Sequence, residues 1–444
     1  MALLDSQPED AYAHHLSQVN KKNQVRATED IFNEQGVLLV KKGMPISEQL
    51  ADQVIKHKLL RPIEHSVNIE KIIDAGRLFK AFSFLFTRYP DCEAVHQNMT
   101  LEMLLRDLCG EYGRFSLLQQ KMTVLSMQRP HEFEKGLFCA WFSMALARKM
   151  DLSMQQISDA FMAGLIHDTG MLHISSEILD KREALTPTEW RTIQSHPLIG
   201  DLFLKQIPGL SPIVARATLE HHERRDGAGY PAGKFSENLC TEGQIVAIAD
   251  SICAIRMLRL SGTEGNLANL LPIIQFNERS YDPGSYKALF SLIRTSGLEP
   301  GRILADTHLG AEIRILILAH RQLNRCFLPL DKVIQLLPES SDLRRVRSAI
   351  DQIHSCWFAV ASSGLLADSV LQWLEQCLVN TEQEDYAAVE EVKVMLKELH
   401  WQLLQVRKSL AILKDDEGFK AIEMQQALKS ALKLQEGLDE VFKR

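Results

Sequence analysis

Hydrophobic positions recur at three- and four-residue spacing along most of the chain, which predicts helices rather than strands. A break is expected at Pro130, and residues 261–284, rich in Gly, Ser, Asn and Pro, predict a loop-bearing connection. The helical period is found in residues 100–127, 137–150, 157–166, 188–206, 211–223, 243–260 and 285–297, and from 310 to the C-terminus. The expected fold class is therefore mainly α.

One short segment near the N-terminus departs from this pattern. Val37–Val40 is β-prone and has a glycine turn on each side, and Ser47 is suited to cap a short helix after it. Residues 24–70 are therefore expected to form a small β-hairpin/helix module. Residues 1–20 are polar without a clear period, and we expect a loose leader there.

The C-terminal part contains a heptad seam, which Asp415–Gly418 interrupts before a second amphipathic stretch over 424–442. Two interpretations stay open: an intramolecular helical hairpin, which is favoured, and a helix that dimerises or docks a partner. The seam alternates three and four residues apart at Val389, Val392, Leu396, Leu399, Leu403, Val406, Leu410 and Leu413.

The length of 444 residues indicates several domains. The predicted division is a small α/β module (1–70), a helical connector (71–124), a helical core domain (125–300) and a C-terminal helical domain with a terminal hairpin (301–444).

Charge and cysteine usage narrow the class of protein. The net charge of −7 disfavours nucleic acid as a partner, and no window of about 18 apolar residues predicts a membrane span. The acidic start does not resemble a signal peptide. The eight cysteines form no CxxC pair, so we expect buried thiols in a reducing cytoplasm and no structural zinc.

Histidine and aspartate residues gather at the ends of the predicted helices between 157 and 260. Imidazole and carboxylate together suit zinc, iron and manganese, and a carboxylate can bridge two ions. Two such metals stabilise both the attacking and the leaving oxygen of a phosphoester displacement. A single His-Asp or His-Pro pair is more often structural. The ordered set of such residues argues for metal-assisted phosphoester hydrolysis. The set is His167, Asp168, His196, His221, His222 and Asp250.

A glycine- and proline-containing loop, Asp226–Pro231, begins four residues after His222. We expect it to line the rim of the same site, where Tyr230 could donate a hydrogen bond to a phosphate. The competing interpretation is a surface turn with a packing tyrosine.

These ordered motifs resemble the HD-GYP domain, a family within the HD superfamily of all-helical metal phosphohydrolases. The resemblance covers roughly residues 125–297, so the core domain is expected to be an HD-GYP domain. Members of this family hydrolyse cyclic di-GMP, a bacterial second messenger, to pGpG or GMP. Residues 24–70 more weakly resemble a small module often found ahead of such domains, and the part after 310 resembles no family we can name.

By this resemblance the six residues of the set are metal ligands, with Asp168 as the bridge and the catalytic carboxylate. Tyr230 and Arg259 match positions that family members turn towards the phosphates, and a guanidinium suits that role. The implied cofactor is a divalent metal, iron or manganese rather than zinc or magnesium, as one ion, two ions or none.

The sequence departs from the family at three places. The position of a metal-binding histidine on the preceding helix falls on Lys135, and Met171 replaces a lysine that helps with phosphate. After Asp250, Cys253 and Gly262 replace an aspartate and a basic residue. An ammonium aimed at a dication is repelled, although it could lose its proton or stand in for one cation. A helix register shifted by one turn would instead make His131 the missing ligand.

These departures lead us to expect a weak phosphodiesterase or an inactive domain of cyclic di-GMP signalling that binds the nucleotide or a protein partner. The alternatives are an active metal-dependent cyclic di-GMP phosphodiesterase and a phosphohydrolase acting on another nucleotide. A protein partner would bind through the loop Asp226–Pro231, called the glycine–tyrosine–proline loop below, or through the C-terminal helices. A homodimer is a further option.

Overall fold

The computed structural model describes residues 11–305, 308–337, 343–379 and 385–442. It forms two compact units, each described by itself below. The first contains residues 1–222, 230–232 and 239–253, and the second contains residues 223–229, 233–238 and 254–444. The described residues are mostly helical, which confirms the predicted fold class. The four-part domain division stays a prediction.

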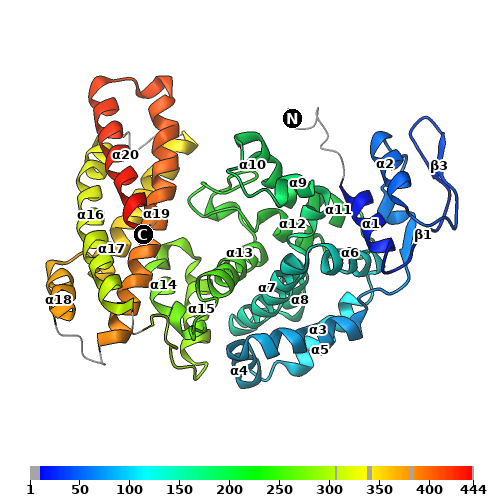
Figure 1. The fold of residues 1–444 in the computed structure, drawn as a ribbon, viewed down its shortest axis with the longest axis horizontal. Coiled ribbons are helices and arrows are strands. Elements are labelled where there is room, and N and C mark those ends of the chain that lie inside the picture. Colours follow the sequence, from blue (N-terminus) through cyan, green and yellow to red (C-terminus); the bar gives the residue numbers. More distant parts are fainter. Residues whose placement is uncertain (1–10, 306–307, 338–342, 380–384, 443–444) are drawn as a thin grey trace. The chain divides into compact units, whose positions relative to one another are not determined.

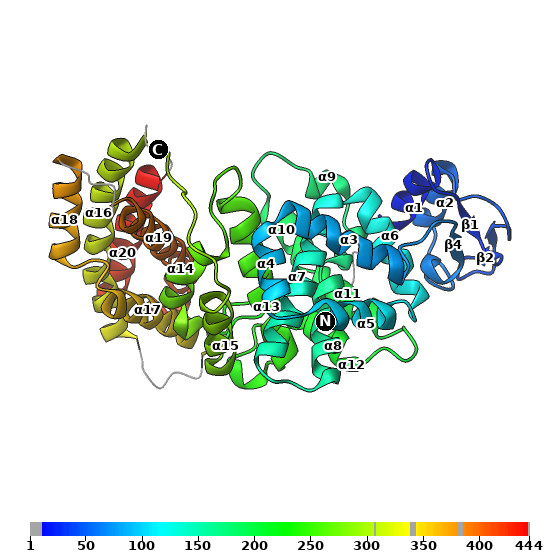
Figure 2. The ribbon, with the colours of Figure 1, turned by 90° about the horizontal axis from the view of Figure 1, so that it is seen from below.

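The first unit begins with a small α/β module (Figures 1 and 2). Two short antiparallel pairs, β1–β4 and β2–β3, pack with helices α1 and α2, and the Ser47 hydroxyl caps α2 by accepting from the Leu50 N–H. The elements are α1 (Tyr12–Asn20), β1 (Val25–Ala27), β2 (Ile31–Phe32), β3 (Leu38–Val40), α2 (Glu48–Lys56), η1 (Ile63–His65) and β4 (Val67–Ile69).

The predicted leader is wrong over residues 12–20, which form helix α1. Tyr12, Leu16 and Val19 are spaced four and three apart and are fully buried, but the polar residues between them hide this period in the sequence. The first ten residues of the predicted leader lie outside the described residues.

Helices make up the rest of the first unit. The predicted helix over 100–127 is two helices, whereas Pro130 lies at the first position of a new helix as expected. The elements are α3 (Ala75–Arg88), α4 (Pro90–Asn98), α5 (Glu102–Tyr112), α6 (Ser116–Gln128), α7 (Pro130–Lys149), α8 (Met154–Ile166), η2 (Thr169–His173), α9 (Ser176–Leu179), α10 (Pro187–Ile193), α11 (His196–Leu204), α12 (Pro212–Glu220) and α13 (Thr241–Ala254).

Helices α7 and α8 pack side by side at the centre of this unit and approach closely through two glycines (Figure 1). A Cβ atom on Gly164 would lie 2.7 Å from the Cys139 carbonyl oxygen, and one on Gly136 would lie 2.6 Å from that of Leu165. Only glycine allows the two backbones to come this near. The close crossing brings the N-terminal half of α7 beside the C-terminal end of α8, where His167 follows.

The second unit takes up most of the C-terminal half. Its short element η3 (Ser236–Asn238) comes before α13 of the first unit in the chain. After α13, a π-helical turn, η4 (Ile255–Arg259), replaces the predicted last turn of the 243–260 helix. The other elements are η5 (Leu267–Leu270), α14 (Leu271–Phe276), η6 (Glu278–Ser280), α15 (Pro283–Arg294), α16 (Leu309–Leu336), α17 (Arg344–Ser363), α18 (Asp368–Val379), α19 (Asp385–Asp415), η8 (Glu417–Phe419) and α20 (Ile422–Phe442).

The long helices α16, α17, α19 and α20 pack along one another (Figure 1). All eight seam residues are buried, and α19 turns through η8 into α20, which packs against it. The seam is therefore used within this chain, as the hairpin interpretation requires. Among the described helices, none has the length and apolar character needed to cross a membrane.

Candidate metal centre

The six predicted ligands lie together in the first unit, each at or near a helix end or on α13. His167 and Asp168 follow α8, and His196 begins α11. His221 and His222 follow α12. One ligand atom from each of Asp168, His196, His221 and His222 lies within 4.8 Å of the others. Three chain segments thus deliver these four side chains to one point.

Backbone carbonyls orient three of the imidazole rings. The Nδ1 atoms of His167, His196 and His221 lie 2.8, 2.7 and 2.6 Å from the carbonyl oxygens three residues earlier. Because a carbonyl only accepts, each Nδ1 must carry the hydrogen, and each Nε2 of a neutral ring presents a lone pair to the site. This is the orientation that metal-ligating histidines usually have.

The Asp168 carboxylate faces two sides. Its Oδ1 lies 3.2 Å from His196 Nε2 and 3.9 Å from His221 Nε2. Its Oδ2 lies 3.1 Å from His167 Nε2. The two oxygens therefore face two different positions, one beside His196 and His221 and one beside His167, and the bridging role of Asp168 stays a prediction.

Lys135 takes one of these two positions. Its Nζ lies 2.8 Å from Asp168 Oδ2 and 2.7 Å from Asp250 Oδ1, and its side chain is 21 % exposed. Burial lowers the pKa of this ammonium, but the charges of Asp168 and Asp250 outweigh burial and raise the pKa well above its usual value. Lys135 is therefore a fixed cation in the site.

His131 lies one turn before Lys135 on α7 and is exposed. The register that would make His131 a ligand is therefore not the register of this structure. The contacts of α7 with the two carboxylates are made by Lys135.

Cys139 was not among the predicted site residues. Its Sγ and one ligand atom each of His167 and Asp250 lie within 4.8 Å of one another, on the side of the site that Lys135 occupies. Burial raises the pKa of the Cys139 thiol well above its usual value, and a hydrogen bond with Cys253 adds to this effect. The spacing was the available signal, because Cys139 lies four residues after Lys135 on the same helix face.

Charges and burial shift the pKa values of His221, His222 and Asp168. Burial, followed by the charges of neighbouring histidines, lowers the pKa of His221 and of His222 well below the usual value. Burial raises the pKa of Asp168, but His167 and Lys135 outweigh it and hold this pKa well below its usual range. His221 and His222 therefore present neutral imidazoles beside an ionised carboxylate.

This donor set fits a divalent metal. His196 Nε2 and His221 Nε2 lie only 3.3 Å apart, and with both Nδ1 hydrogens engaged by carbonyls, two lone pairs would face each other. Asp168 Oδ1 is buried and has no hydrogen bond of suitable geometry among the described residues. A cation held by Asp168, His196, His221 and His222 would satisfy these atoms.

Gly170 and Met171 belong to η2, directly after Asp168. A Cβ on Gly170 would lie 2.1 Å from the His196 carbonyl oxygen, so this glycine allows η2 and α11 to touch. Met171 is partly buried, and its N–H donates to the Asp168 carbonyl. Its thioether offers no charge to a phosphate.

The glycine–tyrosine–proline loop brings Tyr230 beside the metal centre. The Tyr230 ring lies 4.7 Å from the His222 ring, and its N–H donates to the His222 carbonyl. Burial, with the charges of Asp168 and Asp250, raises the pKa of the Tyr230 hydroxyl. The hydroxyl therefore keeps its hydrogen and remains a donor.

Arg259 belongs to the second unit. Its guanidinium forms an ion pair with Glu398 of α19 at 2.9 Å, and Glu398 also accepts from the Asn277 amide at 3.0 Å. The predicted phosphate-binding role of Arg259 stays a prediction.

Similarity to known proteins agrees with this geometry. Residues 119–284 match the model of the HD domain family. The chain is 26% identical to a 3'3'-cGAMP-specific phosphodiesterase of Vibrio cholerae, over 48% of this chain and 46% of that protein. It is 31% identical to a cyclic di-GMP phosphodiesterase of Pseudomonas aeruginosa, over 44% of this chain and 47% of that protein.

A third relative is a cyclic di-GMP phosphodiesterase of Thermotoga maritima, which is 37% identical over 35% of this chain and 43% of that protein. The chain spans about half the length of the curated relatives it matches. The HD domain family is metal-dependent, which agrees with the histidine and aspartate cluster. Residues 119–284 therefore form an HD domain of the HD-GYP type.

Proposed function

We propose that this HD domain binds a cyclic dinucleotide at a centre formed by one divalent metal and the Lys135 ammonium, and that it hydrolyses the nucleotide slowly or not at all. The observation that carries the proposal is the pair of contacts from Lys135 Nζ to Asp168 and Asp250, at 2.8 and 2.7 Å. These are the two carboxylates that a second metal would need.

The chemical consequence follows from the difference between an ammonium and a dication. A second metal, if bound, would supply a Lewis acid for a phosphoryl oxygen and for a water molecule. An ammonium neutralises the carboxylates but coordinates no water. The centre keeps enough positive charge to hold a phosphodiester and loses half of the two-metal clamp.

Iron or manganese is the proposed metal, held by Asp168, His196, His221 and His222 as one ion. Imidazole with carboxylate suits both metals, and the set lacks the thiolates typical of structural zinc sites. When bound, the metal would act as a Lewis acid on the phosphodiester. Asp168 orients the metal and balances its charge, and Tyr230 is placed to donate a hydrogen bond to a phosphate oxygen.

The proposed ligands are cyclic di-GMP and the related 3'3'-cGAMP, since relatives are named as phosphodiesterases of these compounds. The alternative, an active phosphodiesterase that uses one metal, is favoured by the complete cluster around Asp168. Both versions place the chain in bacterial cyclic dinucleotide signalling.

The test compares the manganese-loaded wild-type protein with Lys135→His, which offers a neutral ligand in place of the ammonium. We expect both proteins to bind cyclic di-GMP or 3'3'-cGAMP in equilibrium dialysis, and hydrolysis at least ~10-fold faster in Lys135→His. Lys149→His, at the other end of α7, is the control and should behave as the wild type. Equal, rapid hydrolysis by wild type and Lys135→His would favour the active alternative. Failure of the wild type to bind either nucleotide would reject the proposal.

A further inference from the structure

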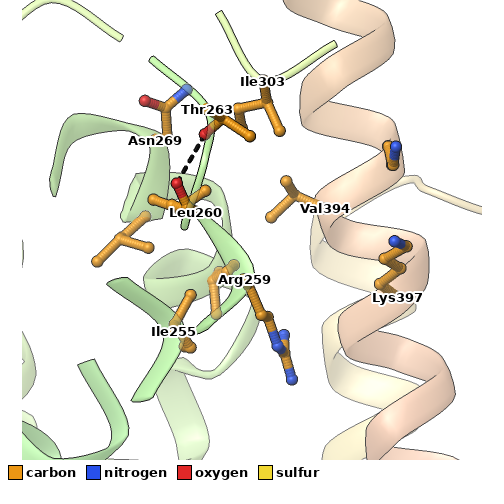
Figure 3. A pocket seen from close by; sticks show the side chains of 11 residues that line it. Ile255, Arg259, Leu260, Thr263, Asn269, Ile303, Val394 and Lys397 are labelled. Carbon is orange, nitrogen blue, oxygen red and sulfur yellow. Dashed lines mark hydrogen bonds between the residues drawn. The ribbon is translucent and has the colours of Figure 1, made fainter. Parts of the chain in front are cut away.

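A cavity of about 230 Å³ lies within the second unit (Figure 3). It is formed by the π-helical turn η4, the segment that follows it, α14 and one face of α19. Val394 reaches from α19 into the space bounded by Leu260, Thr263 and Ile303 (Figure 3). The lining residues are Ile255, Arg259, Leu260, Thr263, Asn269, Leu270, Ile273, Ile303, Lys393, Val394 and Lys397.

The walls of this cavity favour an apolar occupant. Six of the lining residues are aliphatic. The two neutral polar side chains are already engaged: Thr263 Oγ1 donates to the Leu260 carbonyl at 2.9 Å, and the Asn269 amide donates to the Gly301 carbonyl at 2.9 Å. A buried hydrocarbon chain would meet surface of matching polarity, and its transfer from water is favourable.

The cavity is also lined by three cations, of which two are paired. Arg259 contacts Glu398 at 2.9 Å, and Lys393 contacts Glu312 at 2.8 Å. Lys397 is exposed, and in the described part of the chain it has no ion pair. The protein atoms that surround its amine partly desolvate it and, with the charge of Lys393, lower the pKa of Lys397, against the opposing charge of Glu312. Three cations and two carboxylates leave one positive charge for an occupant to balance.

We propose that this cavity binds a monocarboxylate with a short aliphatic chain, whose carboxylate pairs with Lys397 and whose chain lies against Val394, Leu260 and Ile303. The cavity volume of about 230 Å³ is many times the ~10–15 Å³ that one water molecule needs, so the cavity has room for a chain of several methylene groups. Octanoate carries such a chain and the required charge. The site is formed by the second unit alone, so this inference does not rest on the proposed function of the HD domain.

The test measures octanoate binding to the full chain by isothermal titration calorimetry, with octan-1-ol as a probe of equal chain length without the charge. We expect saturable binding of one octanoate per chain and weaker binding of octanol. Lys397→Met removes the charge but keeps most of the side-chain length, and should weaken octanoate binding by ~10-fold or more, the usual loss for a charge-assisted contact. Val394→Trp fills the cavity and should abolish binding.

Lys408→Met is the matched control, since Lys408 is exposed on the same helix and does not line the cavity. It should bind octanoate as the wild type does. Absence of saturable octanoate binding to the wild type would overturn the proposal. Binding unchanged in Lys397→Met, or octanol binding as tight as octanoate binding, would overturn it as well. Lys397→Met changes an exposed side chain, so this arm does not depend on whether Val394→Trp folds.

Discussion

Lys135 and Asp168 lie in direct contact at the candidate metal centre, with 2.8 Å between Lys135 Nζ and Asp168 Oδ2. Asp168 directs one oxygen to the histidines at 196 and 221 and the other to Lys135 and His167. Loss of the carboxylate would remove a proposed metal ligand and leave the ammonium with Asp250 as its remaining acidic contact. The two residues are therefore expected to act as one unit.

Asp168→Ala should remove the bound metal, because Asp168 supplies the carboxylate of the group formed with His196, His221 and His222. Metal content measured by elemental mass spectrometry after iron or manganese loading gives the result. Asp107→Ala, at an exposed position of α5, is the control. Unchanged metal content in a folded Asp168→Ala protein would contradict the proposed site.

The residue types and their order along the chain predict the His and Asp side chains of the site, but not all of the residues that contact them. The six His and Asp positions follow from the motifs, and the position of Lys135 follows from counting along a helix. Cys139 was missed because a lone cysteine in an apolar run is normally a packing residue. Its proximity to His167 and Asp250 depends on the glycine-mediated crossing of α7 and α8, which requires tertiary structure.

At the scale of elements, the contact between η2 and α11 fixes the relative placement of Asp168 and His196. Gly170→Ala would put a Cβ 2.1 Å from the His196 carbonyl oxygen, so the two backbones must separate. We expect a destabilisation of about 1–3 kcal/mol and weaker metal binding. Thermal unfolding and metal titration check this.

Gly110→Ala is the control for that experiment. Gly110 lies within α5, and a Cβ there meets no atom within 4 Å. Alanine should stabilise this helix by about 0.5–1 kcal/mol. If Gly170→Ala is no less stable than Gly110→Ala and binds metal normally, the contact between η2 and α11 has no role in shaping the site.

Helix α1 makes the first unit sensitive to acid through His15. Burial lowers the pKa of His15 from its ordinary 6.5 to about 4, with a smaller opposing effect of Gln128. Between these values the unfolded chain binds the proton more strongly, so stability is complete above pH 6.5 and falls as the pH drops towards 4. The loss is at most ~3 kcal/mol.

Denaturant unfolding at pH 7.5 and pH 4.5 should show a smaller difference in His15→Gln than in the wild type. His14→Gln changes the exposed neighbour on the same helix and should keep the wild-type difference. An identical pH dependence in the wild type and His15→Gln would show that His15 is not the group that titrates.

The accuracy of the predicted elements depends on how regular the local pattern is. The long C-terminal helices and the Ser47 cap follow from period and capping residue alone. Helix α1, and α14 within the expected connection at 261–284, were not predicted. Each is short and amphipathic, and the tertiary contacts that stabilise it are not encoded in the local sequence.

At the scale of the whole molecule, the chain forms two compact units with separate cores. The predicted ligands all belong to the first unit, and the heptad seam belongs to the second. Substitutions in the core of the second unit should therefore lower its stability without changing metal binding. The division was not evident from the sequence, because the helical period continues from one unit into the next.

Leu403→Ala in the seam should destabilise the second unit by about 2–5 kcal/mol, the usual cost of a cavity in a packed core, and leave metal content unchanged. Ile412→Ala is the control, since Ile412 on the same helix is 61% exposed. Thermal unfolding and elemental analysis of both variants give the two readouts. Loss of metal in a folded Leu403→Ala protein would contradict the independence of the units.

The most direct test of the central claim is the number of metal ions per chain in the wild type and in Lys135→His, loaded anaerobically with iron or manganese and measured by elemental mass spectrometry. The account predicts about one ion in the wild type and a second in Lys135→His. Two ions in the wild type, or no gain in Lys135→His, would contradict the claim that the Lys135 ammonium takes the place of a second metal.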